Sequence, residues 1–565
     1  MKRAKIIFLC LFLLGAGIRA IDVARPFDGS IREVWRECDV ASIARNYYRE
    51  SMNLFYPRVD WRGDGPGFVE MEFPIFPWFV AVLYKCFGFD EVLGRALAYL
   101  FSLFTLLIFF RLSRYFLPDL GAIASSLFFI LSPLVIRMSN RLQPEGLMFA
   151  CYLLAAYAFI RWLDDNSWNY YCIALFATAL AILSKATAAH IGFLFAILIL
   201  ARKGWSVLGK IRVWFFAVAS LLPAIIWYTH AYNFWLNYGN SLGLSNEYHW
   251  INWEFFSKST SVPIIGRLEI SYIWMPTGLI LALFGIFYKR SEMVVKYSLC
   301  WLASVFIFYI IAARSAGNIA LDYYHVFSAV PAALLIGAGA EEMCRLIPRR
   351  FFLFILIVVS GILALISGIV GSGFFGQSSK GLIKLFLLLG LFDALLILFL
   401  FPQSFGLQRN IMQKEPSLLK TLIFSFLAFA LSATFLFEAR QVRYDIIRPG
   451  YGEGMYECAK AFSSQIPENA LIVASGGSRK DNQGYSIATN APYMFYWLDR
   501  RGFNIFHEEQ SVDTIKSYVQ RGARYFIAEK PAINLKAGLE SDLKREFTLI
   551  KECDKALLFD LTSRK

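Results

Sequence analysis

The chain has 565 residues, 57% of them hydrophobic, and a formal net charge of +14. Soluble domains are about 45–50% apolar, and the excess here lies in long uncharged runs such as FFLFILIVVSGILALISGIVGSGFF. Runs of about 18 or more such residues indicate membrane-spanning helices. The composition therefore excludes an ordinary soluble protein and predicts a polytopic α-helical membrane protein.

The positive charge and the cysteines exclude two further classes of protein. Lys and Arg cluster in short loops between the apolar runs, which is the distribution that sets membrane orientation rather than nucleic-acid binding. The nine cysteines include no CxxC pair, which argues against zinc and iron–sulfur centres.

The N-terminal segment MKRAKIIFLCLFLLGAGIRA has a basic start and a short apolar core, but it lacks the small-x-small end of a cleaved signal peptide. We therefore expect a retained first span and about 13 spans in all. The two spans on either side of Ser184-Lys185 are short for a bilayer of about 30 Å, which leaves open a bent or merged span there. The further spans are expected at 91–115, 119–136, 143–163, 169–184, 187–202, 211–230, 272–288, 294–312, 323–341, 351–371, 380–401 and 418–438.

Orientation follows from the loops between these spans. With the N-terminus inside, the inner loops are RLSRYFLPD, RWLDDNSWN, RKGWSVLGKIR, KRSEMVVK, EEMCRLIPRR and QRNIMQKEP, and five of these six are net positive. We expect a multi-pass protein of the inner or plasma membrane with its C-terminus outside. The long segments 21–90 and 231–271 then lie on the outer face, where function usually resides.

The composition changes near residue 440. ALIVASGG and ARYFIAEK are typical of short buried strands, and SVDTIKSYVQRG is typical of a capped helix ending at Gly522. We therefore predict a transmembrane domain over 1–440 and a small extracytoplasmic α/β domain over 441–565. Cys458 and Cys553 would form a disulfide if this domain lies outside the cytoplasm.

The first outer segment contains two helical patterns. In VASIARNYY the apolar positions recur at helical spacing from Val40 to Tyr47, which predicts a helix in the membrane interface, with Asp39 just before its apolar face. FPIFPWFVAVLYKCFG predicts a second such helix, opened by prolines. The alternative for the first pattern is an ordinary solvated, salt-bridged helix.

Further polar residues gather on the outer side, near the ends of predicted spans. Intramembrane charges are costly and are functional candidates by default, although Lys185 is equally expected to snorkel to the surface. The tyrosines also fit an interfacial aromatic belt. The residues are Arg137, Arg141, Glu145, Lys185, Glu247, His249, Arg314, Asn318, Asp322, Tyr323, Tyr324 and His325.

Acids and bases on one outer face, above an apolar bundle, suit an enzyme that processes the charged head of a lipid. A carboxylate can take a proton from an attacking hydroxyl, and Lys or Arg can hold a phosphate as it leaves. The sequence contains neither a Walker loop nor a Ser–His–Asp set. A nucleotide-sugar donor is not expected, because the polar face looks away from the cytoplasm.

Several motifs occur together over residues 1–440, namely ECDVASIARNYY, the EFP and AVLYKCFG that follow it, LGRALAYLFSLFTLLIFFRLSRYF, PEGLMFA and DYYHVFSAVPAALLIGAGAEE. In their order and topology the chain resembles the GT-C membrane glycosyltransferases of the protein O-mannosyltransferase and lipid A aminoarabinose transferase group (family 39, PMT-like). The resemblance implies a GT-C fold. It also implies transfer of a sugar, with inversion, from a polyprenyl-phosphate carrier on the extracytoplasmic face.

The resemblance implies a first-loop aspartate as the catalytic base. Asp39 is the best match and Glu37 is the rival, because the place of the family's Asp-Glu pair here holds Arg36-Glu37. The Glu-Lys-Pro of the aminoarabinose transferases reads Glu72-Phe73-Pro74, so its phosphate-binding lysine is missing. The candidates to hold the donor phosphate instead are Lys185, Arg314 and Arg141. The candidates to bind substrate are Glu72, Glu145, Asp322, Tyr323, Tyr324, His325 and His249.

We therefore predict a polyprenyl-phosphate-sugar-dependent hexosyl- or pentosyltransferase that acts on a hydroxyl of a protein, lipid A or glycan acceptor. The alternative is a transporter or flippase of lipid-linked sugars, which would favour inverted repeats that the sequence does not display. No cofactor is required by the residues, and a divalent metal would be held by Glu72, Glu247 and His249. A nucleic-acid partner is not expected.

Overall fold

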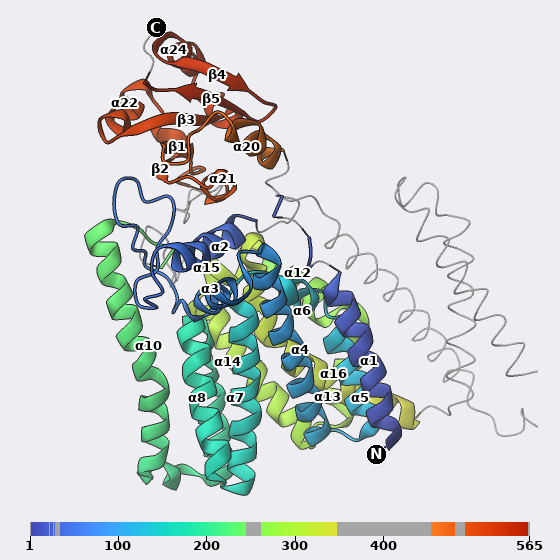
Figure 1. Ribbon diagram of the computed structural model, residues 1–565. Helices are drawn as coiled ribbons and strands as arrows, with labels where there is room; N and C mark the ends of the chain where they lie inside the picture. Colours follow the sequence, from blue (N-terminus) through green and yellow to red (C-terminus); the bar gives the residue numbers. More distant parts are fainter. Residues whose placement is uncertain are drawn as a thin grey trace, which may run out of the picture.

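The computed structural model describes residues 2–346 and 454–562, apart from residues 22 and 26 and the segments 29–33, 245–260 and 481–491. A bundle of long helices forms the lower part of the molecule, and a sheet with its own helices lies over the upper end of the bundle (Figure 1). The N-terminus lies at the lower end of the bundle (Figure 1).

The elements of the bundle, in which η marks 3-10 helices except for the π-helix η4, are α1 (Lys2–Ala20), α2 (Val34–Arg49), α3 (Ile75–Phe87), α4 (Glu91–Phe116), α5 (Asp119–Leu131), α6 (Pro133–Arg137), η1 (Met138–Asn140), α7 (Glu145–Asp165), α8 (Trp168–Ser184), η2 (Ala186–His190), α9 (Ile191–Lys203), η3 (Trp205–Gly209), α10 (Ile211–Tyr238), α12 (Ser261–Leu268), η4 (Glu269–Trp274), α13 (Pro276–Tyr288), α14 (Met293–Ile311), α15 (Ala313–Ala316), η5 (Ile319–Ser328) and α16 (Ala329–Leu346). The elements of the C-terminal region are α20 (Met455–Ser463), β1 (Leu471–Ser475), α21 (Pro492–Leu498), β2 (Gly502–Ile505), η8 (His507–Glu509), α22 (Val512–Gln520), β3 (Ala523–Glu529), α23 (Lys530–Ile533), α24 (Leu539–Glu546), β4 (Thr548–Glu552) and β5 (Ala556–Asp560).

Within the described residues, 6 helices are long and apolar enough to cross a membrane, or up to 8 if each of two bent pairs is one span. They include α4, α7, α10 and α14, which match predicted spans within a few residues, except that α10 continues to Tyr238. The spans predicted at 351–371, 380–401 and 418–438 lie outside the described residues. The helical membrane character is therefore confirmed, whereas the total of about 13 spans stays a prediction.

The chain bends or reverses at two places where the sequence suggested single or merged spans. α5 ends at Leu131, and the chain bends by 55° before α6 and η1, where one span over 119–136 was expected. Pro133 opens α6 and has no N–H to continue the hydrogen bonding of α5. α8 and α9 are separate antiparallel helices, because α9 returns to the end of α7, where Arg202 pairs with Asp164.

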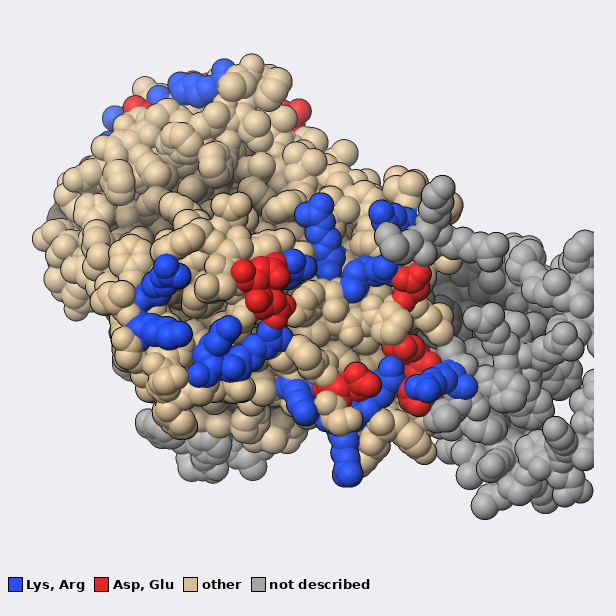
Figure 2. Space-filling model, turned by 90° about the horizontal axis from the view of Figure 1, so that it is seen from below, with Lys and Arg blue, Asp and Glu red and all other residues tan. Residues whose placement is uncertain are grey.

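Charged side chains gather at the lower end of the bundle (Figure 2). The loops that join α4 to α5, α7 to α8, α9 to α10 and α13 to α14 all lie there (Figure 1). They are loops for which the sequence predicted a cytoplasmic position. Ion pairs such as Lys289 with Glu341 at 3.2 Å neutralise part of their charge. The alternation of inner and outer loops is thus reproduced, and the side of the membrane stays a prediction.

Helix α2 is covered on both faces, unlike the half-exposed interface helix or the solvated helix expected from its sequence. It packs against α3 on one side and α21 of the C-terminal region on the other. Even its polar side chains Glu37, Asp39 and Arg45 are buried. Buried polar groups must find partners within the protein, so α2 directs these side chains to specific contacts rather than to water.

The C-terminal region is built on a five-stranded sheet in the order β2-β1-β3-β5-β4. β1 is parallel to both β2 and β3, and β5 is antiparallel to β3 and β4. The strands predicted in ALIVASGG and ARYFIAEK are confirmed as β1 and β3. The predicted helix is confirmed as α22, which Ser511 caps by accepting a hydrogen bond from the Thr514 amide at 3.2 Å.

The predicted disulfide between Cys458 and Cys553 is present, with its two Cα atoms 5.7 Å apart. It joins α20 to the residue that follows β4. The bond closes a separation of 95 residues and so ties the two ends of the C-terminal region together.

Candidate functional site

Four charged side chains meet near the upper end of the bundle, and we call them the charge cluster: Arg36, Glu72, Glu145 and Lys185. They come from four separate elements. α2 supplies Arg36, the segment before α3 supplies Glu72, the first turn of α7 supplies Glu145, and Lys185 follows the last residue of α8. A carboxylate in the first turn of a helix is favoured by the positive end of the helix dipole, which suits Glu145 at the start of α7.

The charge cluster is held together by alternating charges. A terminal guanidinium nitrogen of Arg36 lies 2.7 Å from Oε1 of Glu145 and 3.3 Å from Oε1 of Glu72. The ammonium of Lys185 donates a hydrogen bond to Glu145 and lies 3.9 Å from Glu72. Glu145 and Lys185 are each 2% exposed, whereas Glu72 is 14% exposed. Glu72 is therefore the more loosely held and more accessible carboxylate.

Two tyrosines of η5 complete the cluster. Arg36 donates a hydrogen bond of 2.8 Å to the Tyr323 hydroxyl. The Lys185 ammonium lies 4.3 Å from the ring centroid of Tyr323 and 4.9 Å from that of Tyr324, within the range of cation–π attraction. The structure thus brings together five of the predicted site residues, and Lys185 is buried among them rather than snorkelling to the surface.

Burial and neighbouring charge act on the two cations in different ways. Burial lowers the pKa of Lys185, and the positive charge of Arg36 adds to this effect. Burial also opposes the charge of Arg36, but its acidic neighbours, Glu145 first, outweigh that cost and raise its pKa above the ordinary value. Arg36 is therefore the permanent cation of the cluster, and Lys185 is the one that can lose its charge.

Asp39 lies one helical turn after Arg36 on α2 and is 1% exposed. Its Oδ1 accepts a hydrogen bond of 2.9 Å from the indole N–H of Trp61. A hydrogen bond to a carboxylate favours the charged form and fixes its orientation, and both effects suit a proton acceptor.

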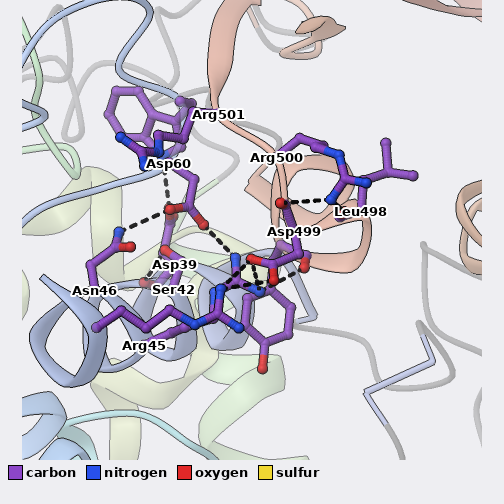
Figure 3. A network of polar contacts seen from close by, with 12 residues as sticks. Asp39, Ser42, Arg45, Asn46, Asp60, Leu498, Asp499, Arg500 and Arg501 are labelled. Atoms are coloured by element: carbon purple, nitrogen blue, oxygen red, sulfur yellow. Dashed lines mark hydrogen bonds and ion pairs between the residues drawn. The ribbon is translucent and has the colours of Figure 1, made fainter. Parts of the chain in front are cut away.

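Further along α2, side chains connect the helix to the C-terminal region (Figure 3). Asp60 accepts hydrogen bonds from Arg45 at 2.7 Å and from Asn46 at 2.8 Å. Arg45 also donates to the backbone carbonyl of Tyr496 at 3.0 Å and lies 3.0 Å from the Asp499 carboxylate. Figure 3 shows Asp60 and Asp499 both close to the side chain of Arg45.

Glu37, the rival of Asp39, stands in different surroundings. One carboxylate oxygen accepts the Leu142 amide at 2.9 Å, and the other lies 3.3 Å from Arg95 of α4. Its side chain is fully buried. Glu37 therefore ties α2 to α4 and to the segment that leads into α7, which is a structural task.

The other predicted residues that the structure describes do not contact the charge cluster in the same way. Asp322 forms a buried ion pair with Arg137. His325 lies with Nδ1 2.7 Å from Glu269 and Nε2 2.8 Å from the Ala316 carbonyl, so it serves a separate polar cluster. Arg141 follows η1, and Arg314 lies in α15; both are partly buried. His249 and Glu247 lie outside the described residues.

Sequence reasoning missed Glu269, which anchors that second polar cluster. Its carboxylate accepts hydrogen bonds from Ser328 at 2.9 Å and from Trp274 at 2.9 Å, besides its contact with His325. The available signal was a single acid at the edge of a long apolar stretch, since an acid at membrane depth is a functional candidate by default. The predicted span began at residue 272, after Glu269, and so passed over it.

Comparison with known proteins places this geometry in context. Residues 66–228 match the model of the dolichyl-phosphate-mannose-protein mannosyltransferase family. No curated protein sequence matches the chain significantly. The fold is similar to that of ArnT from Cupriavidus metallidurans in the apo state, with 13% identity, a TM-score of 0.61 and coverage of 97% of each chain.

Two further solved structures share the fold. One is ArnT from Cupriavidus metallidurans bound to undecaprenyl phosphate, with 12% identity, a TM-score of 0.58 and coverage of 98% of each chain. The other is the Archaeoglobus fulgidus oligosaccharyltransferase tethered to an acceptor peptide, with 12% identity and a TM-score of 0.51. That match covers 97% of this chain and 74% of the other. The chain therefore has the GT-C fold of these membrane glycosyltransferases, and the resemblance inferred from its sequence motifs is confirmed.

Proposed function

We propose that the protein transfers a sugar, with inversion, from a polyprenyl-phosphate carrier to a hydroxyl of an acceptor at the extracytoplasmic face of the membrane. The observation that carries the proposal is the charge cluster, which sets Arg36 and Lys185 at the upper end of a GT-C bundle. Support comes from a relative of the same fold that was solved with undecaprenyl phosphate bound.

In this proposal Arg36 and Lys185 hold the donor phosphate. Phosphate oxygens accept strong, charge-assisted hydrogen bonds from both side chains. Glu72 and Glu145 neutralise the two cations. An incoming phosphate would take the place of Glu72, because that carboxylate is farther from both cations and more exposed than Glu145. Arg141 and Arg314 remain further candidates for phosphate contacts.

Asp39 is proposed as the base. Its carboxylate takes the proton of the acceptor hydroxyl, the hydroxyl oxygen bonds to the anomeric carbon, and the bond from that carbon to the phosphate oxygen breaks. The electron pair leaves with the lipid phosphate, whose charge Arg36 and Lys185 stabilise. Glu72, once displaced, would accept hydrogen bonds from sugar hydroxyls, and the Tyr323 hydroxyl would donate or accept them.

The transporter alternative is not favoured, because the matched family and the similar folds are glycosyltransferases. The two functions predict different products. A transferase releases polyprenyl phosphate and a glycosylated acceptor, whereas a flippase moves the intact lipid-linked sugar across the bilayer.

The test is to incubate the purified protein in lipid nanodiscs with a panel of radiolabelled polyprenyl-phosphate sugars and a membrane extract as the source of acceptors. We expect release of polyprenyl phosphate coupled to appearance of label in an acceptor. Asp39→Asn should abolish both signals. Asp64→Asn should leave them unchanged, because the Asp64 carboxylate is exposed and pairs with Arg521 at 2.6 Å. Movement of intact donor across proteoliposomes without any release of polyprenyl phosphate would overturn the proposal.

A further inference from the structure

The loop that follows α2 pairs with the sheet of the C-terminal region. The amide of Gly502 donates a hydrogen bond of 3.1 Å to the carbonyl of Asp60, and the amide of Gly63 donates one of 2.6 Å to the carbonyl of Gly502. Gly502 opens β2, which is the edge strand of the sheet. The segment 60–63 therefore adds itself to a sheet edge, the mode by which an extended segment gains main-chain hydrogen bonds.

This pairing depends on the absence of a side chain at Gly63. A Cβ at Gly502 would instead lie 1.7 Å from the carbonyl oxygen of Ile472, so that glycine serves the contact of β2 with β1. A Cβ at Gly63 would lie 2.6 Å from the ring of Phe503, and Gly63 has a φ of +61°, which disfavours other residues. The close approach of the loop 60–63 to β2 is thus a specific fit rather than a loose surface contact.

In sequence, Trp61 lies between Asp60 and Gly63, whose backbones form these two hydrogen bonds. Its indole N–H donates to the Asp39 carboxylate at 2.9 Å, and both side chains are buried. Asp60, its neighbour, is held to α2 by Arg45 and Asn46. A path of contacts therefore runs from the edge strand β2 to Asp39: a backbone hydrogen bond joins Gly502 to Asp60, and the next residue, Trp61, donates to the Asp39 carboxylate.

We propose that β2 of the C-terminal region positions the reacting carboxylate, and that Trp61 is the positioning residue through which it acts on Asp39. The proposal rests on the proposed function, because it assigns to the C-terminal region a task in that reaction. Trp61 does not touch the reacting atoms. It holds Asp39 in one orientation and favours its charged form by donating a hydrogen bond.

The first experiment removes only the indole N–H. Trp61→Phe should lower kcat about tenfold to a hundredfold, the range expected for loss of a hydrogen bond to a charged group, with KM for the donor within twofold of the wild type. Because the protonated carboxyl becomes easier to form, the acid limb of the pH profile of kcat should move to higher pH. Trp78→Phe is the matched control, since the Trp78 indole donates to the Met52 carbonyl at 2.9 Å in the same outer region.

The second experiment tests the sheet edge and needs no activity. Gly63→Ala should speed hydrogen exchange over residues 58–65, as measured by mass spectrometry of the full-length protein. Gly65→Ala should not, because a Cβ there would lie 3.4 Å from the nearest atom, the Arg62 carbonyl oxygen. In an active protein Gly63→Ala should also reproduce the pH shift of Trp61→Phe.

The outcomes separate the two proposals. A wild-type protein that transfers sugar, with a Trp61→Phe variant of unchanged kcat and pH profile, overturns the positioning role and leaves the function standing. Unchanged exchange in Gly63→Ala overturns the role of β2, whether or not the protein is active. An inactive wild-type protein overturns the proposed function, and the exchange comparison then decides alone whether β2 fixes the loop that carries Trp61.

Discussion

Arg36 of α2 lies 2.7 Å from Glu145 of α7. In the sequence this arginine stands at the place where the family resemblance implies the first of two acids. Helix α2 therefore contributes a cation to the upper end of the bundle. The acid at the second place, Glu37, is bound to Arg95 and the Leu142 amide. Of the two acids in the first turns of α2, Glu37 is thus engaged in structural contacts, whereas Asp39 accepts a hydrogen bond from Trp61 and is the one proposed as the base.

Asp39→Asn should lower kcat by at least a hundredfold, because loss of a positioned general base typically costs a factor of about 10² to 10⁴. The amide has nearly the same shape, so KM for the donor should change little. Steady-state kinetics with a polyprenyl-phosphate sugar measure both constants. Full activity of Asp39→Asn would exclude it as the base.

Glu37→Gln should lower stability rather than catalysis. The change removes one charge from a buried ion pair with Arg95, and we expect a loss of about 3–5 kcal/mol in the free energy of unfolding. Thermal unfolding in detergent, together with kcat of the folded fraction, distinguishes the two effects. Glu457→Gln is a suitable control, because that side chain is 72% exposed and its pair with Lys460 contributes little. A normal melting temperature with lost kcat would restore Glu37 as the catalytic acid position.

Donor binding should weaken at alkaline pH because of Lys185. Burial lowers the pKa of this lysine below its ordinary value of 10.5, so it loses its charge, and its attraction for phosphate, at a lower pH than a free lysine would. In the wild type we expect KM for the donor to rise as the pH increases and Lys185 loses its proton. Lys185→Arg should flatten the alkaline rise, since arginine stays protonated. Lys289→Arg, at the lower end of the bundle, should retain the wild-type profile.

The sequence predicted those parts of the molecule that depend on local pattern. Long apolar runs located α4, α7 and α14, and runs of β-branched and aromatic residues located β1 and β3. Burial in a membrane or in a protein core produces these patterns directly in the sequence. The Cys458–Cys553 bond was also predicted, since only these two cysteines were assigned to the C-terminal domain. Each of these features needs no knowledge of distant partners.

The features that were missed or misjudged depend on tertiary contacts. α2 has the spacing of an amphipathic surface helix, yet α21, more than 400 residues later, packs against it and accepts a hydrogen bond from Arg45. Trp61 acquires its role only because Gly502 pairs with the loop around it. From the sequence, Lys185 was equally expected to snorkel to the surface. In the structure it is buried against Glu145 and Tyr323. The spacing of residues along the chain does not reveal such tertiary contacts.

Acid should loosen the first outer loop through Glu50. Burial opposes the charge of Glu50, but hydrogen bonds from Arg62 and Arg58 outweigh it and lower its pKa to about 2. Because the folded value lies below the ordinary value of 4.5, the stabilisation is complete above about pH 4.5 and is lost as pH falls toward 2. Hydrogen exchange over residues 50–62 should therefore speed up between these values, relative to the intrinsic rate. Glu50→Gln should remove that pH dependence, and an unchanged dependence would show that other carboxylates control the loop.

Loss of the Cys458–Cys553 disulfide should destabilise the C-terminal region and, through β2, the loop that carries Trp61. A cross-link that closes 95 residues restricts the unfolded chain, and its removal typically costs about 2–4 kcal/mol. We expect Cys553→Ser to unfold the region at lower temperature, whereas Cys86→Ser, an exposed free cysteine on α3, should not. Disulfides persist in oxidising compartments, so alkylation of the protein from intact cells, before and after reduction, also tests orientation. Cys458 and Cys553 should react only after reduction if the region lies outside the cytoplasm, and their reaction without reduction would contradict the predicted topology.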